Sequence, residues 1–249
     1  MIGRNAHGHG EEAKLNLNFR ALATDYDGTL ASQGRVLPGT LTALVRARLA
    51  ERKLILVTGR ELPNLLATMP QFGMFSCVVA ENGALLYWPS TRAEARLTEP
   101  PSAEFLERLR TEQVPLSVGR SVIATLKIHQ KTVVRVIREM GLDLQLSMNR
   151  ESMMILPAGI NKATGLEMAL QDLALDFSEV VGIGDAENDL PFLSRCGFSV
   201  AVANALPMVK SIADMVTRAE EGAGVSECID RLLAAPAVLA RRKRTRQPC

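Results

Sequence analysis

The sequence has few aromatic residues, little net charge and no long hydrophobic run. Aromatic residues make up 4% of the 249 positions, and the net charge is +2. Nucleic-acid binders combine a basic stripe with exposed aromatic side chains, so this composition argues against a nucleic-acid partner. No apolar segment reaches the roughly 20 residues of a membrane span, and residues 1–14 lack the apolar core of a secretory signal. We therefore expect a cytoplasmic protein with an aliphatic core and no membrane partner.

Cysteine is also scarce, and no two cysteines form a C-x-x-C pair. The four residues are scattered along the chain: Cys77, Cys196, Cys228 and Cys249. Buried free thiols are therefore a better interpretation than disulfides or a zinc site. His7 and His9 lie in a polar, glycine-rich N-terminal stretch, where composition favours a flexible tail over a metal site.

What the sequence does contain is an alternation of apolar strands and helical segments. Strands are expected at about 19–26, 53–58 and 76–80, with helices at about 40–52 and 61–69. Residues 53–58 are apolar without alternation, which is typical of a strand covered on both faces. Alternating strands and helices with short links predict a parallel sheet with helices on both faces.

The alternation is interrupted after residue 83 and resumes near residue 158. The interrupting segment contains expected helices at 102–113 and 130–140, with strand regions at 116–128, 143–148 and 152–156. It has no strand-helix-strand alternation, so we expect an α+β insert with a largely antiparallel sheet. The second half then continues with helices and strands as follows: helix 161–174, strand 180–184, helix 189–195, strand 199–202, helix 206–213, strand 215–217 and helix 223–234.

These segments predict an α/β protein with a doubly wound, mostly parallel, Rossmann-like core sheet and an inserted smaller α+β domain. The expected parts are a flexible tail, a core in two pieces, an insert and a basic tail: residues 1–17, 18–83 with 158–235, 84–157 and 236–249. The basic run Arg241–Arg246 could contact a polyanion, but a solvated terminus is the better interpretation.

Two aspartates one residue apart follow the first strand, in the run Asp25-Tyr26-Asp27-Gly28-Thr29-Leu30. Side chains alternate along an extended chain, so Asp25 and Asp27 would point the same way if the strand continued regularly. Two neighbouring carboxylates repel each other, and a divalent cation between or beside them would relieve this repulsion. A strand that ends in an ordinary Asp-Gly turn is the structural alternative.

Three more polar clusters fall at strand ends or helix starts: Thr58-Gly59-Arg60, Lys162, and Gly184-Asp185-Ala186-Glu187-Asn188-Asp189. Each has a structural alternative when taken singly, namely a strand-to-helix turn, an exposed lysine and a helix cap. In an open parallel sheet, however, ligands bind beyond the carboxyl ends of the strands. Their occurrence together therefore indicates one shared site.

The chemistry of these clusters is that of phosphoryl transfer. Carboxylates from Asp25, Asp27 and Asp185, with Asp189 behind them, suit Mg²⁺. Thr58 and the Gly59 N–H can hold phosphate oxygens at a helix start, and Lys162 supplies a positive charge. A carboxylate can itself be the nucleophile and form an aspartyl-phosphate.

Together the four motifs resemble those of the haloacid dehalogenase-like (HAD) phosphohydrolases. The insert after the third strand resembles the cap of subclass IIB, which includes Cof-type sugar phosphatases, sucrose- and trehalose-phosphate phosphatases, archaeal-type phosphoglycolate phosphatases and phosphomannomutases. The resemblance covers residues 19–233 or thereabouts. Tyr26 departs from the usual aliphatic residue, and Lys162 is followed by Ala-Thr-Gly rather than a more typical Gly.

The resemblance implies a role for each core motif. Asp25 would be the nucleophile and a Mg²⁺ ligand. Asp27 would be the general acid and base, and its backbone carbonyl would also bind the metal. Lys162 would neutralise charge on the nucleophile and the phosphate, and Asp185 would bind the metal directly.

The resemblance also implies supporting and substrate-binding residues. Thr58 and Gly59 would hold the phosphoryl oxygens, while Asn188 and Asp189 would support the metal and Lys162. Arg60 and Asn82 would be candidates for substrate contact. Polar residues of the cap are further candidates, above all two arginines: Arg120 and Arg150.

The function expected from the resemblance is a Mg²⁺-dependent phosphatase that acts on a small phosphorylated metabolite, either a sugar phosphate or a phosphoglycolate-like acid. It would work through an aspartyl-phosphate, as a monomer or homodimer. Two alternatives stay open. One is a phosphomutase, which the small insert makes less favourable, and the other is a non-catalytic module that binds a phosphorylated ligand.

Overall fold

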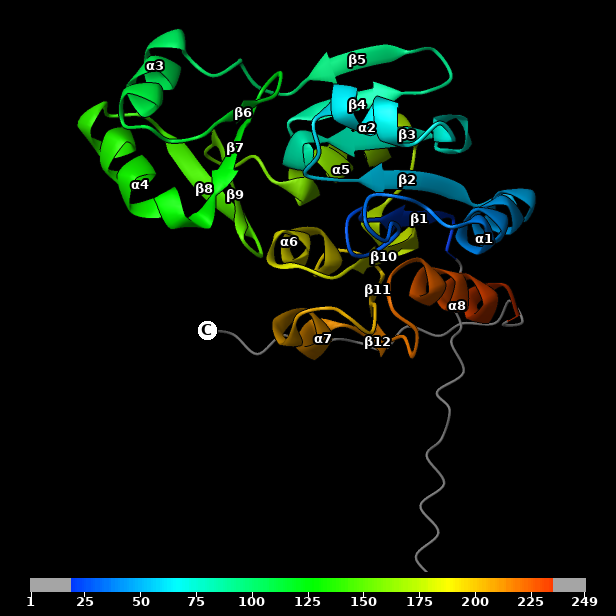
Figure 1. Cartoon of the computed structure of the whole chain (residues 1–249). Coiled ribbons are helices and arrows are strands. Elements are labelled where there is room, and N and C mark those ends of the chain that lie inside the picture. Colours follow the sequence, from blue (N-terminus) through cyan, green and yellow to red (C-terminus); the bar gives the residue numbers. More distant parts are fainter. Residues whose placement is uncertain (1–18, 235–249) are drawn as a thin grey trace, which may run out of the picture.

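The computed structural model describes residues 19–234, so both expected tails, with His7, His9, Arg241–Arg246 and Cys249, lie outside the described residues. A large sheet runs through the molecule in the order β12-β11-β10-β1-β2-β3-β4-β5. Figure 1 shows a second, smaller unit beside the end of the sheet to which the β2 arrow points. The carboxyl ends of the central strands therefore face this unit.

The first six strands in that order are parallel, as expected. Their bounds are β1 (Ala21–Thr24), β2 (Lys53–Val57), β3 (Cys77–Ala80), β10 (Val180–Gly184), β11 (Phe198–Ala201) and β12 (Met215–Val216). The residues of β1 and β10 are all buried, which explains why these strands read as continuous apolar runs.

Helices cover both faces of this sheet. After β3 the chain direction along the sheet reverses, so right-handed connections put α1 and α2 on one face and α5, α6 and α7 on the other. The helices are α1 (Pro38–Leu49), α2 (Leu62–Thr68), α5 (Lys162–Asp172), α6 (Leu190–Leu193), α7 (Pro207–Ile212) and α8 (Glu221–Ala234). Helix α1 packs against α8, and α5 packs against α6. The doubly wound α/β fold is confirmed.

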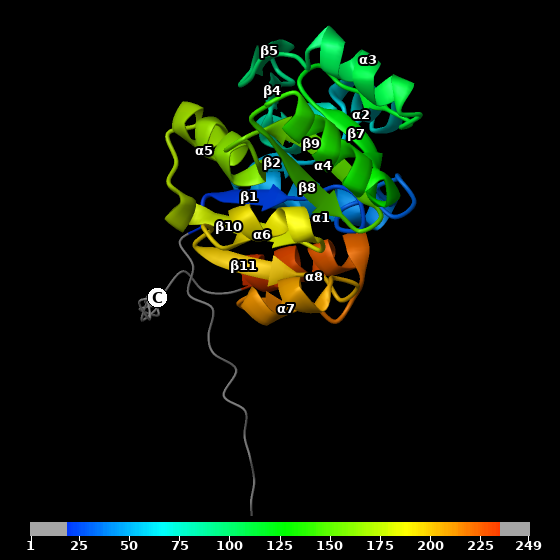
Figure 2. The same cartoon turned by 90° about the vertical axis from the view of Figure 1, so that its left-hand side faces the viewer.

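The smaller unit has its own antiparallel sheet, in the order β6-β7-β9-β8. Its elements are α3 (Ala103–Thr111), β6 (Ser117–Val118), β7 (Ile123–Leu126), α4 (Gln130–Glu139), β8 (Leu144–Asn149) and β9 (Ser152–Pro157). Both helices pack on the outer face of this sheet around Phe105, Val133 and Ile155, and Figure 2 shows the sheet from another side. We call residues 97–157 the cap.

The sequence placed one segment differently from the structure. Strands β4 (Leu85–Trp88) and β5 (Ala93–Arg96) were expected inside the insert, but they extend the large sheet as antiparallel edge strands. β4 follows β3 after only four residues, so it folds back directly onto its neighbour. β5 has the sequence Ala-Glu-Ala-Arg and is largely exposed, so it carries no apolar signal.

The remaining sequence expectations concern thiols and membranes. Cys77, Cys196 and Cys228 are buried free thiols, as expected. Among the described residues, the structure has no helix of the length and hydrophobicity needed to cross a bilayer.

Close packing of α5 on the sheet requires a glycine in its first turn. A Cβ at Gly165 would lie 2.6 Å from the Gly83 Cα and 2.6 Å from the Val79 Cγ1. Because backbone cannot move aside cheaply, Gly165→Ala should lower the free energy of unfolding by about 1–3 kcal/mol, although alanine favours helix. Urea unfolding followed by circular dichroism measures this. Gly39→Ala in α1, where a Cβ would meet nothing within 4 Å, is the control and should leave stability unchanged or higher. Equal effects of the two substitutions would contradict this packing.

Candidate active site

The site forms where three adjacent strands end. In the sheet β1 lies between β2 and β10, with Thr24 beside both Leu56 and Ile183. The Asp25 N–H continues the ladder by donating to the Ile183 carbonyl at 2.9 Å. The residues that follow each strand are therefore brought to one edge of the sheet.

Lys162 lies at the centre of this edge. Its Nζ is 2.5 Å from Asp25 Oδ1 and 2.6 Å from Asp189 Oδ1, and the lysine and Asp189 side chains are fully buried. The residue is the first of α5, whose start is fixed by the Asn161 capping box. A buried ammonium is tolerated only when paired and hydrogen-bonded, and two carboxylates meet that need here.

Asp189 is also engaged through its second oxygen. Asp189 Oδ2 accepts the N–H groups of Asp185 at 2.8 Å and Ala186 at 3.0 Å. The approach is so close that a Cβ at Gly184 would lie 2.6 Å from that oxygen. Asp189 therefore positions both Lys162 and the loop that carries Asp185.

Asp185 is bonded from the core and from the cap. Thr29 Oγ1 donates to Asp185 Oδ1 at 2.9 Å, and Arg150 Nη2 donates to Asp185 Oδ2 at 2.6 Å. The Arg150 N–H also donates to Glu187 at 3.1 Å. Arg150 of the cap thus binds Asp185, the candidate metal ligand, directly.

The described residues contain one group of carboxylates that could hold a metal ion, formed by Asp25, Asp185 and Asp189. One oxygen from each lies within 4.8 Å of the others, and all three residues are buried. Oxygen-only donors of this kind fit Mg²⁺. Both Asp189 oxygens are bonded to groups of the core, whereas one of the two Asp185 oxygens is bonded to Arg150 of the cap. Asn188 Oδ1 is buried nearby without a partner among the described residues.

Burial and mutual repulsion shape the ionisation of this group. Burial raises the pKa of Asp25 well above its usual range; Lys162 opposes this shift, while Asp189 and Asp185 add to it. Burial and Asp189 likewise raise the pKa of Asp185. Burial lowers the pKa of Lys162, but Asp189 and Asp25 raise it more, so the net shift is upward. A bound cation would relieve the repulsion that raises the two aspartate pKa values.

Asp27 is not a member of this carboxylate group, and it lies beyond β1, which ends at Thr24. Arg60 holds the Asp27 carboxylate with two bonds, Nε to Oδ2 at 2.6 Å and Nη2 to Oδ1 at 2.7 Å. The Arg60 guanidinium lies 5.0 Å from the centre of the Tyr26 ring, and the Tyr26 hydroxyl donates to the Gly34 carbonyl. Tyr26 therefore supports Arg60, a role that the sequence did not suggest.

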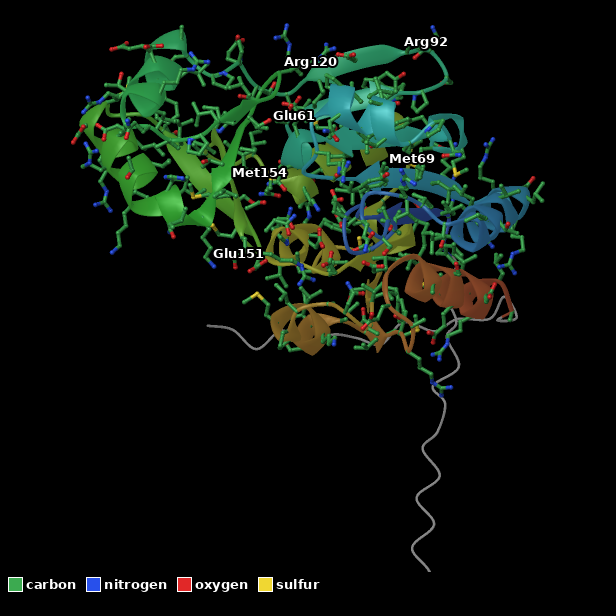
Figure 3. All side chains as sticks on the ribbon, viewed as in Figure 1. Glu61, Met69, Arg92, Arg120, Glu151 and Met154 are labelled. Atoms are coloured by element: carbon green, nitrogen blue, oxygen red, sulfur yellow. The ribbon has the colours of Figure 1, made fainter. Side chains whose placement is uncertain are left out.

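Thr58 and Gly59, the residues expected to hold phosphate oxygens, directly follow β2. Thr58 is buried, and its Oγ1 accepts the Arg60 N–H at 3.1 Å. A Cβ at Gly59 would lie 3.0 Å from Met154 Sδ and 3.7 Å from Asn188 Nδ2. Figure 3 shows Met154 where the cap sheet meets the core. Met154 lies in an apolar run of β9, and nothing in the sequence marked it as a site residue.

The remaining candidates lie in different places. Asn82 bridges the two units, because its Nδ2 donates to Ser147 of the cap at 3.0 Å and its Oδ1 accepts from Asn188 at 3.1 Å. Arg120 instead pairs its guanidinium with Glu94 at the edge of the large sheet, so the structure does not bring it together with the other candidates.

Comparisons with known protein families, sequences and structures agree with one another. The chain matches the family described as haloacid dehalogenase-like hydrolase over residues 22–118 and 130–229. It is 31% identical over 226 residues to a phosphoglycolate phosphatase of Methanothermobacter thermautotrophicus, covering 86% of this chain and 99% of that protein. It is 29% identical over 226 residues to phosphoglycolate phosphatase 2 of Saccharolobus solfataricus, covering 88% and 95%. A solved HAD subclass IIB sugar phosphatase has a similar fold, with a TM-score of 0.70 at 19% identity, over 86% and 98% of the two chains.

The pairing of Lys162 predicts a large loss of stability when its charge is removed. Lys162→Met leaves Asp25 and Asp189 buried without a positive partner, so the free energy of unfolding in metal-free buffer should fall by about 3–5 kcal/mol. Urea unfolding measures the difference. Lys131→Met, at an exposed position of α4, is the control and should change stability by no more than about 0.5 kcal/mol. Similar values for the two variants would rule out a central role for the Lys162 ion pairs.

Proposed function

The chain belongs to the haloacid dehalogenase-like hydrolases and is a phosphatase, and from that premise we propose that it uses Mg²⁺ to hydrolyse a small phosphorylated acid of the phosphoglycolate type. The observation that carries the proposal is the Asp25 carboxylate, held by Lys162 at 2.5 Å beside a second aspartate that can share a metal. Thr58 and Gly59 lie at the same sheet edge, beneath the cap.

In the first step, an Asp25 carboxylate oxygen attacks the phosphorus atom, and the bond from phosphorus to the leaving oxygen breaks. Asp27 gives its proton to that oxygen, so an alcohol departs and a phosphoryl group stays on Asp25. Asp25 can serve as nucleophile because Lys162 holds one of its oxygens and orients the carboxylate. Arg60 positions Asp27 between its proton transfers.

In the second step, water attacks the phosphorus of the aspartyl-phosphate. Asp27 accepts a proton from that water, and the bond from phosphorus to Asp25 breaks. Inorganic phosphate leaves, and both aspartates return to their starting states. The same residue, two positions after the nucleophile, thus acts first as an acid and then as a base.

Positive charge and hydrogen-bond donors hold the phosphoryl group during both steps. Asp25, Asp185 and the Asp27 backbone carbonyl would hold Mg²⁺, which when bound screens the repulsion between the nucleophile and the anionic phosphate. Lys162, Thr58 and the Gly59 N–H would hold the phosphoryl oxygens. Asp189 and Asn188 support these groups from behind.

Two features of the cap favour a small and negatively charged substrate. Met154 lies against Gly59, so little room is left above the expected phosphate position. Arg150 reaches the same site from the β8–β9 turn and offers a positive charge to a substrate carboxylate. Two relatives are named phosphoglycolate phosphatases, and 2-phosphoglycolate has both required features. We further propose that the cap closes over the substrate and excludes water from the site.

The nucleophile is tested by Asp25→Asn. Phosphate release from 2-phosphoglycolate with Mg²⁺ should fall at least about 1000-fold, because an amide cannot form the aspartyl-phosphate. Asp230→Asn, on the exposed surface of α8, is the matched control and should retain full activity. Excess chelator should also stop the wild type. Hydrolysis that survives in Asp25→Asn or in chelator would overturn the mechanism.

The close approach of Met154 to Gly59 predicts that a smaller residue at position 154 would let larger substrates bind. Met154→Ala should raise the ratio of kcat/KM for glucose 6-phosphate to that for 2-phosphoglycolate by about 10-fold or more, because room is opened above Gly59. Met153→Ala is the control: Met153 is the preceding residue of β9, points into the cap core and should lower stability without changing the ratio. A ratio that moves equally in both variants would refute the assignment.

A further inference from the structure

The turn between β3 and β4, Glu81–Gly83, has an unusual backbone. All three residues have positive φ angles, 51° for Glu81, 55° for Asn82 and 104° for Gly83. Side-chain-bearing residues adopt this region rarely and at a cost, so surrounding contacts must hold the turn in place.

Those contacts reach two segments of the active site. The Glu81 N–H donates to the Arg60 carbonyl at 3.0 Å, and the Asn82 N–H donates to the Thr58 carbonyl at 2.9 Å. A Cβ at Gly83 would lie 1.9 Å from the Asn161 carbonyl oxygen, directly before Lys162. The turn is therefore packed against residues 58–60 and the start of α5 at once.

The Glu81 side chain extends from this turn to the cap and is fully buried. Its Oε1 accepts the Arg120 N–H at 3.0 Å, and its Oε2 accepts the Ser121 N–H at 2.8 Å. Both donors belong to the turn between β6 and β7, and Gly119 of that turn packs so closely that a Cβ there would lie 2.7 Å from Glu81 Oε2. No cation among residues 19–234 pairs with Glu81 in the structure. Its hydrogen-bond partners here are thus supplied by the cap.

We propose that Glu81 is a positioning residue that holds the cap closed over the active site. Each carboxylate oxygen takes one N–H, and such charge-assisted bonds are stronger than neutral ones. When the cap moves away, the buried carboxylate loses both donors, so the contact favours the closed position. The proposal rests on the proposed function only in that closure serves phosphate hydrolysis.

Asn82 adds a second contact of the same kind one residue later. Its amide joins Ser147 of the cap to Asn188 of the core. Figure 3 places Glu61 and Arg120 along the same boundary, where Glu61 accepts a hydrogen bond from Ser117. Glu81 differs from these neighbours because it binds cap backbone, so no cap side chain is needed for its contact.

The test uses three single variants and one double variant of the full chain. Glu81→Gln keeps the size but replaces one acceptor with a donor, and Glu81→Ala removes both acceptors. Gly119→Ala places a methyl group where the carboxylate lies, without changing the core. If these residues act through one contact, the double variant Glu81→Ala with Gly119→Ala should be no worse than Glu81→Ala alone.

Two measurements follow each variant. Hydrogen exchange of the Arg120 and Ser121 amides reports directly on their bonds to Glu81 and does not depend on phosphatase activity. Steady-state kinetics with 2-phosphoglycolate read its consequence. In Glu81→Gln and Gly119→Ala the two amides should exchange about 10-fold faster or more, and KM should rise by a similar factor with kcat within about twofold. Glu81→Ala should show larger shifts in the same direction.

Two controls keep the result specific. Ser121→Ala retains the backbone N–H and should behave as the wild type in both measurements. Gly73→Ala, where a Cβ would meet nothing within 4 Å, controls for glycine replacement. Unchanged exchange in Glu81→Gln, or strictly additive losses in the double variant, would overturn the proposal. A wild type that releases no phosphate would contradict the proposed function, and the exchange data alone would then decide whether Glu81 holds the cap.

Discussion

The buried ammonium of Lys162 is the interaction on which the rest of the active site depends. It pairs with Asp25, 137 residues earlier, and with Asp189, 27 residues later. Each of these charges would be strongly unfavourable in the interior without the others. The chain therefore satisfies all three only when β1, the start of α5 and the loop after β10 meet at one edge of the sheet. Assembly of the site and folding of the core are in this sense the same event.

The cap is inserted where this constraint is strictest. The last parallel strand before the cap ends at Ala80, and Gly83 of the turn that follows it packs against Asn161, which directly precedes α5. Anything that shifts the exit of the cap would therefore also shift the first turn of α5 and with it Lys162. This contact gives a physical reason for the glycine: a Cβ at Gly83 would collide with the returning chain.

The sequence predicted the parts of the site that depend on strand ends, because apolar runs followed by polar clusters identify those ends without any knowledge of the contacts. It also predicted the parallel sheet, the antiparallel insert and the buried thiols. It could not show that Asp27 turns to Arg60, since that depends on where β1 ends, nor that Arg120 pairs with Glu94. Glu81 and Met154 were missed because a glutamate in a turn and a methionine in an apolar strand look ordinary until their partners across the boundary are known.

The core residues and the cap residues of the site differ in how well they should tolerate substitution. Around the proposed phosphate position, Asp25 and Asp189 are buried and both bonded to Lys162, so replacing Lys162 leaves the two carboxylates without it. Arg150 is 45% exposed and arrives on a hairpin turn, and Met154 contacts the site by packing alone. Substitutions there should alter size and charge above the proposed phosphate position at little cost to the core. Asp185 joins the two sets of residues, because it is bonded by Thr29 from the core and by Arg150 from the cap. The cap therefore contacts the carboxylate that we propose as a metal ligand, and under that proposal Asp185 would couple substrate selection to phosphoryl chemistry.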